Sequence, residues 1–320
     1  MFTDPEFAQV MTDTLAEIEA QLLATVDIEH PLLRESGAHL IHAGGKRFRP
    51  LLTMTAAQLG DPGADGVREA AIALELTHLA TLYHDDVMDE ATKRRNAPSA
   101  NSRWSNSVAI LTGDYLFTEA AQIMADLGPD AVRFQAETFG RLVRGQINET
   151  IPKPEGMDPV DWHLDVLAEK TGSLIACCSH FGAWLSGAPA DQVEKAALFG
   201  EKIGVAFQIS DDIIDIASER SGKTPGTDLM EGIPTLAVLY ALQGDDPSEA
   251  RLRELVSGPV APEDLEESLK LLRRSEALRQ AKDVLSRYIA EARALAESLP
   301  EGATRNAFLD ICGYMAARDI

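Results

Sequence analysis

The feature that most constrains this chain is a helical repeat of apolar residues that continues over almost its whole length. Asp4-Pro5 is typical of a helix N-cap followed by a first-turn proline, and apolar residues then recur every three or four positions from Phe7 to Leu22. Runs that alternate apolar and polar residues, as strands do, are almost absent. The pattern predicts an all-α fold. Because no internal repeat or low-complexity linker divides residues 1–320, we expect a single large helical domain.

Glycines and prolines punctuate the helical repeat and place the remaining helices. We expect these helices roughly over 28–43, 49–59, 65–89, 104–126, 129–149, 159–186, 190–218, 227–243, 263–297 and 303–317.

The composition excludes several classes of protein. Lys and Arg number 29 against 51 Asp and Glu, a formal net charge of −22, which argues against a protein that wraps nucleic acid or binds an anionic membrane. No stretch of about 18 apolar residues occurs, so no membrane span is expected. The three cysteines lack the spacing of a zinc site, and the N-terminus lacks a signal-peptide pattern. We therefore expect a cytoplasmic protein.

Two identical aspartate clusters are the strongest chemical signal. HDDVMDE contains Asp85, Asp86 and Asp89, and SDDIIDI contains Asp211, Asp212 and Asp215. On a helix, residues four apart share a face with Cβ atoms about 6 Å apart, so these carboxylates repel one another. A single cluster could be a solvated acidic face, but two equal patterns within apolar helices favour a shared function. Carboxylate oxygens and substrate phosphates are the ligands Mg²⁺ takes, so the clusters predict magnesium ions that clamp a phosphorylated ligand.

Small groups of basic residues stand out in so acidic a chain, and they supply the counterpart of a phosphate. They are GGKRFRP with Lys46, Arg47 and Arg49, the KRR run at 93–95, Lys170-Thr171, and Lys223. Arg offers phosphate a planar two-pronged donor, and Lys offers a point charge. His78 lies seven residues before Asp85 and therefore on the same helical face.

Taken in order, these motifs resemble the trans-isoprenyl diphosphate synthase family. The match consists of GGKRFRP, then His78 with HDD and Asp89, then Arg94-Arg95, then Lys170-Thr171, then FQISDDIID and Gly222-Lys223. The resemblance implies a helical bundle around a deep central cavity, a homodimer, and head-to-tail condensation of isopentenyl diphosphate with an allylic diphosphate.

The resemblance also implies a role for each matching residue, with Lys170 and the six aspartates taking part in catalysis. Magnesium, or manganese as its substitute, is expected on Asp85, Asp89 and Asp211, with Asp86, Asp212 and Asp215 as further ligands or beside them. The allylic diphosphate is expected at Arg94, Lys170, Thr171, Gln208 and Lys223. The isopentenyl diphosphate is expected at Lys46, Arg49, His78 and Arg95. The family often has a lysine where Ile233 stands, which removes one possible diphosphate contact.

Product length depends, by the same resemblance, on residues just before the first aspartates. In the family a bulky residue at the position of Ala80 shortens products, although an ideal helix places Ala80 about 140° from Asp85. Here Ala80 and Thr81 are both small. We therefore expect a linear product of C20 or longer. Leu74, Leu76 or a residue of a neighbouring helix could form the deeper floor.

Two other functions compete with this interpretation. A terpene cyclase shares the first aspartate motif, but its second metal motif is usually built from Asn, Ser and Glu, and it has no use for a GGKRFRP site. An inactive regulatory subunit of a heteromeric synthase typically loses aspartates, whereas all six are present here. Incubation with magnesium and both diphosphates distinguishes the three by a linear product, a cyclic hydrocarbon or no product.

Overall fold

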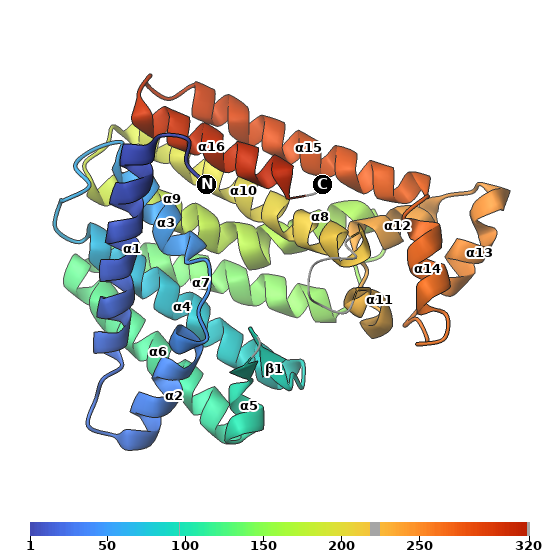
Figure 1. The fold of residues 1–320 in the computed structure, drawn as a ribbon, viewed down its shortest axis with the longest axis horizontal. Helices are drawn as coiled ribbons and strands as arrows, with labels where there is room; N and C mark the ends of the chain where they lie inside the picture. The colour runs from blue at the N-terminus through green and yellow to red at the C-terminus, as the bar shows by residue number, and fades with distance from the viewer. Residues whose placement is uncertain (96, 218–224, 319–320) are drawn as a thin grey trace.

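The computed structural model describes residues 1–95, 97–217 and 225–318, and these residues form layers of packed helices (Figure 1). The first half contains α1 (Pro5–Thr25), α2 (Pro31–His42), α3 (Phe48–Ala57), α4 (Val67–Met88), α5 (Ala100–Arg103), α6 (Asn106–Leu127) and α7 (Pro129–Thr150). The second half contains α8 (Pro159–Leu167), the π-helical turn η1 (Ala168–Gly172), α9 (Ser173–Leu185), α10 (Ala190–Ala217), α11 (Thr227–Glu231), α12 (Leu236–Gln243), the short 3₁₀ turn η2 (Pro247–Glu249), α13 (Ala250–Leu255), α14 (Leu265–Leu272), α15 (Glu276–Glu297) and α16 (Ala303–Ala317). The prediction of an all-α fold is confirmed.

The predicted N-cap of the first helix is confirmed, and a second side chain caps a helix start that was not predicted. Asp4 accepts hydrogen bonds from the N–H groups of Glu6 and Phe7 at 2.9 and 3.2 Å, and Pro5 takes the first helical position. Ser275 caps α15 in the same way, at 3.1 Å from the N–H of Leu278. These caps satisfy donors that the helix itself leaves without a partner.

Two of the predicted helices are wrong in their continuity. The span 263–297 divides into α14 and α15 because Ser275 begins a new helix. The span 227–243 divides into α11 and α12 at Gly232, whose φ of +73° ends a helix, and at Pro234. Apolar periodicity runs across both breaks and therefore could not place them. The predicted helix over 159–186 is confirmed as far as Leu185, and it contains the π turn η1.

The only strands among the described residues are a two-residue antiparallel pair, β1 (Lys93–Arg94) with β2 (Ala97–Pro98). This hairpin directly follows α4 and turns the chain back, so that the carbonyl of Asp86 accepts hydrogen bonds from the N–H of Ala91 and the side chain of Asn101. The sequence contains no alternating run here, and the hairpin was not predicted.

The core is one connected cluster of buried apolar residues with members from α1 through α16. Within it α4 packs on α6 and α3, and α10 packs on α9 and α15. Very close packing depends on glycine: at Gly182 of α9, an added Cβ would lie 2.0 Å from the carbonyl oxygen of Thr53 in α3. That residues 1–320 form one domain remains a prediction.

One buried ionic cluster joins the N-terminal helices. Arg47, which precedes α3, lies 2.5 Å from Glu19 and 3.0 Å from Glu75, and it also donates to the carbonyl of Ile41 at 2.9 Å. A buried arginine with this many partners holds α1, the turn before α3 and α4 together. Arg47 therefore has a structural role, whereas its neighbours Lys46 and Arg49 remain site candidates.

The arrangement brings both aspartate clusters to helix ends. In Figure 1, α4 runs toward the β1 hairpin and α10 runs toward α11, and both helices point to the right of the view. One face of α4 remains half-buried rather than fully buried at His78, Thr81 and Asp85, so solvent reaches it along at least two turns. No helix in the described parts of the chain has the length and apolar character needed to cross a membrane.

Candidate active site

The first aspartate cluster lies at the C-terminal end of α4. Asp89 is the C-cap residue, and its N–H donates to the carbonyl of Asp85 at 2.8 Å. Burial raises the pKa of Asp85 to about 6; Lys170 and Arg94 oppose the rise, and the negative charges of Asp89 and Glu149 add to it. Asp85 therefore lies within electrostatic reach of a lysine and an arginine from two other segments, and both were predicted to bind the same diphosphate.

Asp86 faces away from solvent and holds an arginine. Its side chain is fully buried, and Oδ1 accepts from Nε and Nη2 of Arg94 at 2.7 and 2.6 Å. Oδ2 is buried and has no hydrogen-bond partner. Burial raises the pKa of Asp86, and the hydrogen bond from Arg94 opposes the rise. Asp86 thus fixes Arg94 beside the first cluster, and one of its oxygens is left for a further partner.

Lys170 and Thr171 lie on the π turn η1, which contacts α7 and α10. The Nζ atom of Lys170 lies 2.5 Å from Glu149 at the end of α7. Glu149 was not selected from the sequence, where it looked like one of many acidic residues. Its contact with Lys170 and its effect on Asp85 place it in the site.

The second cluster lies near the C-terminal end of α10. Asp211 Oδ1 forms an ion pair with Nη2 of Arg318, and the guanidinium carbon of Arg318 lies 4.2 Å from the ring centroid of Phe207. The side chain of Arg318 is 11% exposed, and its Nη1 atom is buried without a partner. Arg318 stands at the end of the described chain with no motif around it, so the sequence offered no signal for it.

The other two aspartates of this cluster have different partners. Asp212 is buried, accepts from Gln208 at 3.2 Å, and lies 3.9 Å from Nε2 of His163 in α8. Burial raises the pKa of Asp212 well above its ordinary value, and the charges of Asp228, Asp211 and Asp215 add to the effect. His163, also missed from the sequence, is kept neutral because burial lowers its pKa to about 4.

Asp215 forms hydrogen bonds with residues at the start of α11. Its side chain accepts from the N–H of Asp228 at 3.2 Å, and its carbonyl accepts from the N–H of Gly226 at 3.0 Å. Lys223, predicted to contact the allylic diphosphate, lies outside the described residues.

The residues predicted for the isopentenyl diphosphate gather around His78. Burial lowers the pKa of His78 well below its ordinary value, and the positive charges of Arg49, Arg95, Arg94 and Arg47 lower it further. Arg95 donates to the carbonyl of Gly44, and an added Cβ on Gly45 would lie 2.7 Å from its Nη1. The GGKR turn is thus shaped around Arg95.

Lys46 lies at the rim of this group. Its side chain is exposed and donates to the hydroxyl of Tyr314 in α16 at 3.0 Å. Tyr314 of α16 thus contacts Lys46 of the predicted isopentenyl diphosphate site. Arg318, which follows α16, contacts Asp211 of the predicted metal site.

The donor set fits a hard divalent cation. All six candidate ligands are carboxylates, and Asp86 has a buried oxygen without a partner. In the described parts of the chain, no three His, Cys, Asp or Glu side chains are already grouped closely enough to hold a metal ion. Instead, arginines pair with Asp86 and Asp211.

The two residues predicted to control product length differ in their surroundings. Ala80 is fully buried, and its carbonyl lies near Gly113 of α6, where an added Cβ would be 3.1 Å away. Thr81 is half-buried, shares the face of Asp85, and donates to the carbonyl of His78 at 2.7 Å.

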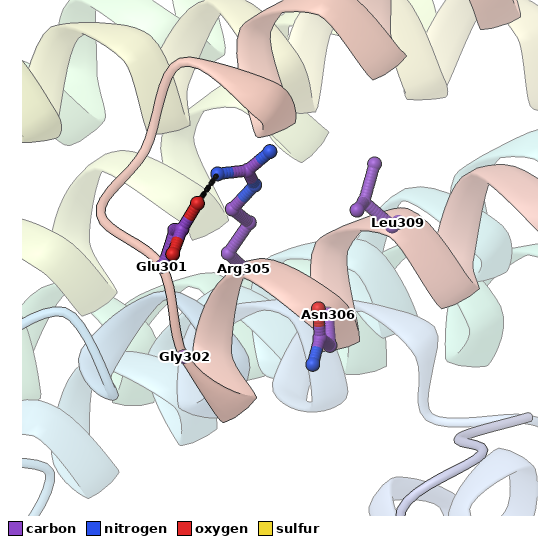
Figure 2. A pocket seen from close by; sticks show the side chains of 5 residues that line it. All are labelled: Glu301, Gly302, Arg305, Asn306 and Leu309. Atoms are coloured by element: carbon purple, nitrogen blue, oxygen red, sulfur yellow. Dashed lines mark ion pairs between the residues drawn. The ribbon is translucent and has the colours of Figure 1, made fainter.

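A pocket at the start of α16 is separate from this site (Figure 2). It is lined by Glu301, Gly302, Arg305, Asn306 and Leu309, and Glu301 pairs with Arg305 at 3.7 Å. Because α16 rises about 1.5 Å per residue, the start of the helix lies roughly 20 Å from Arg318. None of the predicted site residues contributes to this pocket.

Comparison with known proteins yields matches along nearly the whole chain. Residues 30–272 match the family model described as polyprenyl synthetase. Nonaprenyl diphosphate synthase of Mycobacterium tuberculosis is 47% identical over 98% of this chain and 95% of its own length. A dimethylallyltranstransferase of the same organism is 43% identical over 97% and 96%. The crystal structure of geranylgeranyl pyrophosphate synthase from Corynebacterium glutamicum, complexed with calcium and isoprenyl diphosphate, has a TM-score of 0.89 at 43% identity and 99% coverage of both chains.

The raised pKa of Asp85 predicts how stability depends on pH. The pKa is about 6 in the folded protein and about 3.9 in an unfolded chain. The folded protein therefore binds more protons between about pH 4 and 6, and stability falls as pH rises through that window. We expect Asp85→Asn to raise the Tm at pH 7 and to match the wild type near pH 4, as measured by circular dichroism. Glu137→Gln, an exposed site on α7, is the control. A lower Tm for Asp85→Asn than for the wild type at pH 7 would contradict a raised pKa of Asp85 in the folded protein.

Proposed function

The chain belongs to the polyprenyl synthetase family, and we propose that it condenses isopentenyl diphosphate with an allylic diphosphate into a linear all-trans product of C20 or longer. The observation that carries the proposal is the convergence of Lys170 and Arg94 on Asp85, which gathers carboxylates and diphosphate-binding cations at one helix end. Residues 1–320 would act as a single catalytic domain. A terpene cyclase is set aside because the relatives are named as prenyl synthases and transferases.

The chemistry begins with loss of diphosphate from the allylic substrate. Negative charge develops on the leaving oxygens, and Lys170, Arg94 and Gln208 would stabilise it from fixed positions. Magnesium, with manganese as a substitute, would be held by Asp85, Asp89 and Asp211 and would supply Lewis-acid stabilisation of the leaving diphosphate. No nucleophilic side chain is needed, since the double bond of isopentenyl diphosphate attacks the allylic carbon and a proton is then lost.

The second substrate would occupy the basic group around His78. Arg49 and Arg95 would pair with the diphosphate, with Lys46 at the exposed rim. His78, neutral because its pKa is lowered, would act as a hydrogen-bond partner and would not add a charge. Arg47 remains occupied by Glu19 and Glu75 and takes no part.

We propose a homodimer formed through α6 and α7. Val132, Val143 and Ile147 share one face of α7 and are exposed, Ile147 by 53%. On the neighbouring α6, Leu111 is 61% exposed. An apolar face of this kind on a chain with net charge −22 favours burial against a second copy. We also place the protein in the cytoplasm, in agreement with three buried free cysteines.

Loss of one carboxylate should remove most activity. We expect Asp211→Asn to lower kcat/KM roughly 10²-fold or more, the scale of one electrostatic element, while the protein stays folded. Turnover should stop in excess chelator and return with Mg²⁺ or Mn²⁺ but poorly with Zn²⁺, because the ligands are all oxygen atoms. A radiolabelled condensation assay measures this, with Glu137→Gln as the control. Near-normal turnover of Asp211→Asn at saturating Mg²⁺ would refute its role as a metal ligand.

Product length should respond to bulk just before Asp85. We expect Thr81→Phe and Ala80→Phe to shorten the product toward C15, since one helical turn spans about 5.4 Å, close to one isoprene unit. Ala80→Phe should also lose about 1–3 kcal/mol of stability through overpacking, because Ala80 is fully buried near α6. Chromatography of the products measures chain length. Unchanged products from both folded variants would show that neither residue faces the growing chain.

The dimer should depend on the exposed apolar face. We expect the double variant Leu111→Glu and Val143→Glu to sediment as a single copy, because a buried, unpaired charge opposes association. Leu242→Glu, an exposed apolar site on α12, should leave the assembly unchanged. A wild-type protein that sediments as one copy at micromolar concentration would show that the proposal is wrong.

A further inference from the structure

The turn that carries Lys170 has an unusual backbone. Residues Ala168–Gly172 form a π helix between α8 and α9, with one wide turn inside an otherwise α-helical segment. Single π turns inside α-helical segments are rare and occur frequently at functional sites. The contacts that neighbouring helices make with this turn therefore bear directly on where Lys170 lies.

One arginine of α7 connects the turn to α10. Arg141 Nε lies 2.7 Å from Glu169 in η1, and Arg141 Nη2 lies 3.0 Å from Glu201 in α10. The three side chains are 35%, 25% and 32% exposed. Arg144 lies 3.2 Å from the other oxygen of Glu169 but is 62% exposed and contacts only that carboxylate. Among the side chains that the structure describes, only Arg141 forms ion pairs with both the turn and α10.

The same face of α7 contacts the turn at three successive points. Arg141, Gly145 and Glu149 are four residues apart and so lie in one line. Gly145 lies against the backbone of Lys170, where an added Cβ would be 2.4 Å from the amide nitrogen. Glu149 meets the Lys170 side chain at 2.5 Å. The line thus fixes in turn Glu169, the backbone of Lys170 and its ammonium group.

Glu201 connects this line to the second aspartate cluster. It lies seven residues before Gln208 on α10, which places the two on the same face, and Gln208 donates to Asp212. A shift of η1 along α10 would therefore change the distance between Lys170 and the residues proposed to share its diphosphate.

We propose that Arg141 is a positioning residue for Lys170, acting through Glu169 and Glu201 to set where the ammonium meets the allylic diphosphate. The inference rests on the proposed function. Arg141 does not touch the substrate. Without it, two partly buried carboxylates lose their common partner, and the Glu169 carboxylate keeps only the exposed Arg144 as an ion-pair partner among the described residues.

The test compares Arg141→Met and Arg141→Lys with Lys202→Met. Lys202 also forms an ion pair on α10, 2.6 Å from Glu291 of α15 and 33% exposed, but this pair does not involve η1. Steady-state kinetics give KM for each diphosphate separately, and thermal unfolding gives Tm. Calorimetry with inorganic diphosphate and Mg²⁺ gives an affinity that does not depend on turnover.

We expect Arg141→Met to raise KM for the allylic diphosphate roughly tenfold, as for a displaced substrate-positioning group, with KM for isopentenyl diphosphate almost unchanged. Affinity for inorganic diphosphate should fall in parallel. Arg141→Lys should be intermediate, because one ammonium cannot bridge two carboxylates as a guanidinium fork does. Lys202→Met should match the wild type in both KM values.

Two results would overturn the proposal. One is an Arg141→Met protein with unchanged KM and unchanged affinity for inorganic diphosphate. The other is an equal rise in both KM values with a fall in Tm that Lys202→Met reproduces, which would mean that the ion pair only stabilises the fold. A wild-type chain that binds diphosphate but condenses nothing would refute the proposed function instead, and the calorimetric comparison would still decide the role of Arg141.

Discussion

Mutual repulsion among six carboxylates at two helix ends is the constraint on which the rest of this structure depends. Burial makes the ionised carboxylates still less favourable, since it raises the pKa of Asp85 to about 6 and that of Asp212 well above its ordinary value. The cations that offset this charge come from three other segments: Arg94 from the hairpin after α4, Lys170 from η1, and Arg318 just after α16. Each of these contacts joins a segment to one of the two aspartate clusters.

Glycines allow close approach of two of the predicted diphosphate-binding residues. Gly145 lets α7 approach the backbone of Lys170, and Gly45 leaves room for the guanidinium of Arg95. Close backbone approach brings the turns within ion-pair distance, and the ion pairs then fix their orientation. Packing and electrostatics therefore specify the same arrangement, which is the consistency expected of a sequence with a single native structure.

The features predictable from the sequence are those set by near neighbours along the chain. Helical periodicity gave the all-α fold, and the i, i+4 spacing placed Asp85 with Asp89 on one face. The π turn, the pairing of Asp86 with Arg94 and the contact of Arg318 with Asp211 all depend on tertiary packing, so no local pattern signals them. Glu149 and Arg141 were missed for the same reason: an acidic or basic residue on an amphipathic helix looks like an exposed one until its partner is known.

Reaction chemistry and product length are physically separable in this fold. Charge stabilisation requires carboxylates and cations at fixed positions, whereas the similar proteins carry different product names, nonaprenyl and geranylgeranyl. By the proposal made above, length depends instead on the volume beside α4, where Ala80 is buried against α6 and Thr81 is half-buried on the face of Asp85. Because packing density leaves little free space, a change of a few methylene groups there has a large steric effect and leaves the carboxylates untouched. A sequence identity of 47% to a nonaprenyl diphosphate synthase is therefore stronger evidence for the type of reaction than for the length of the product.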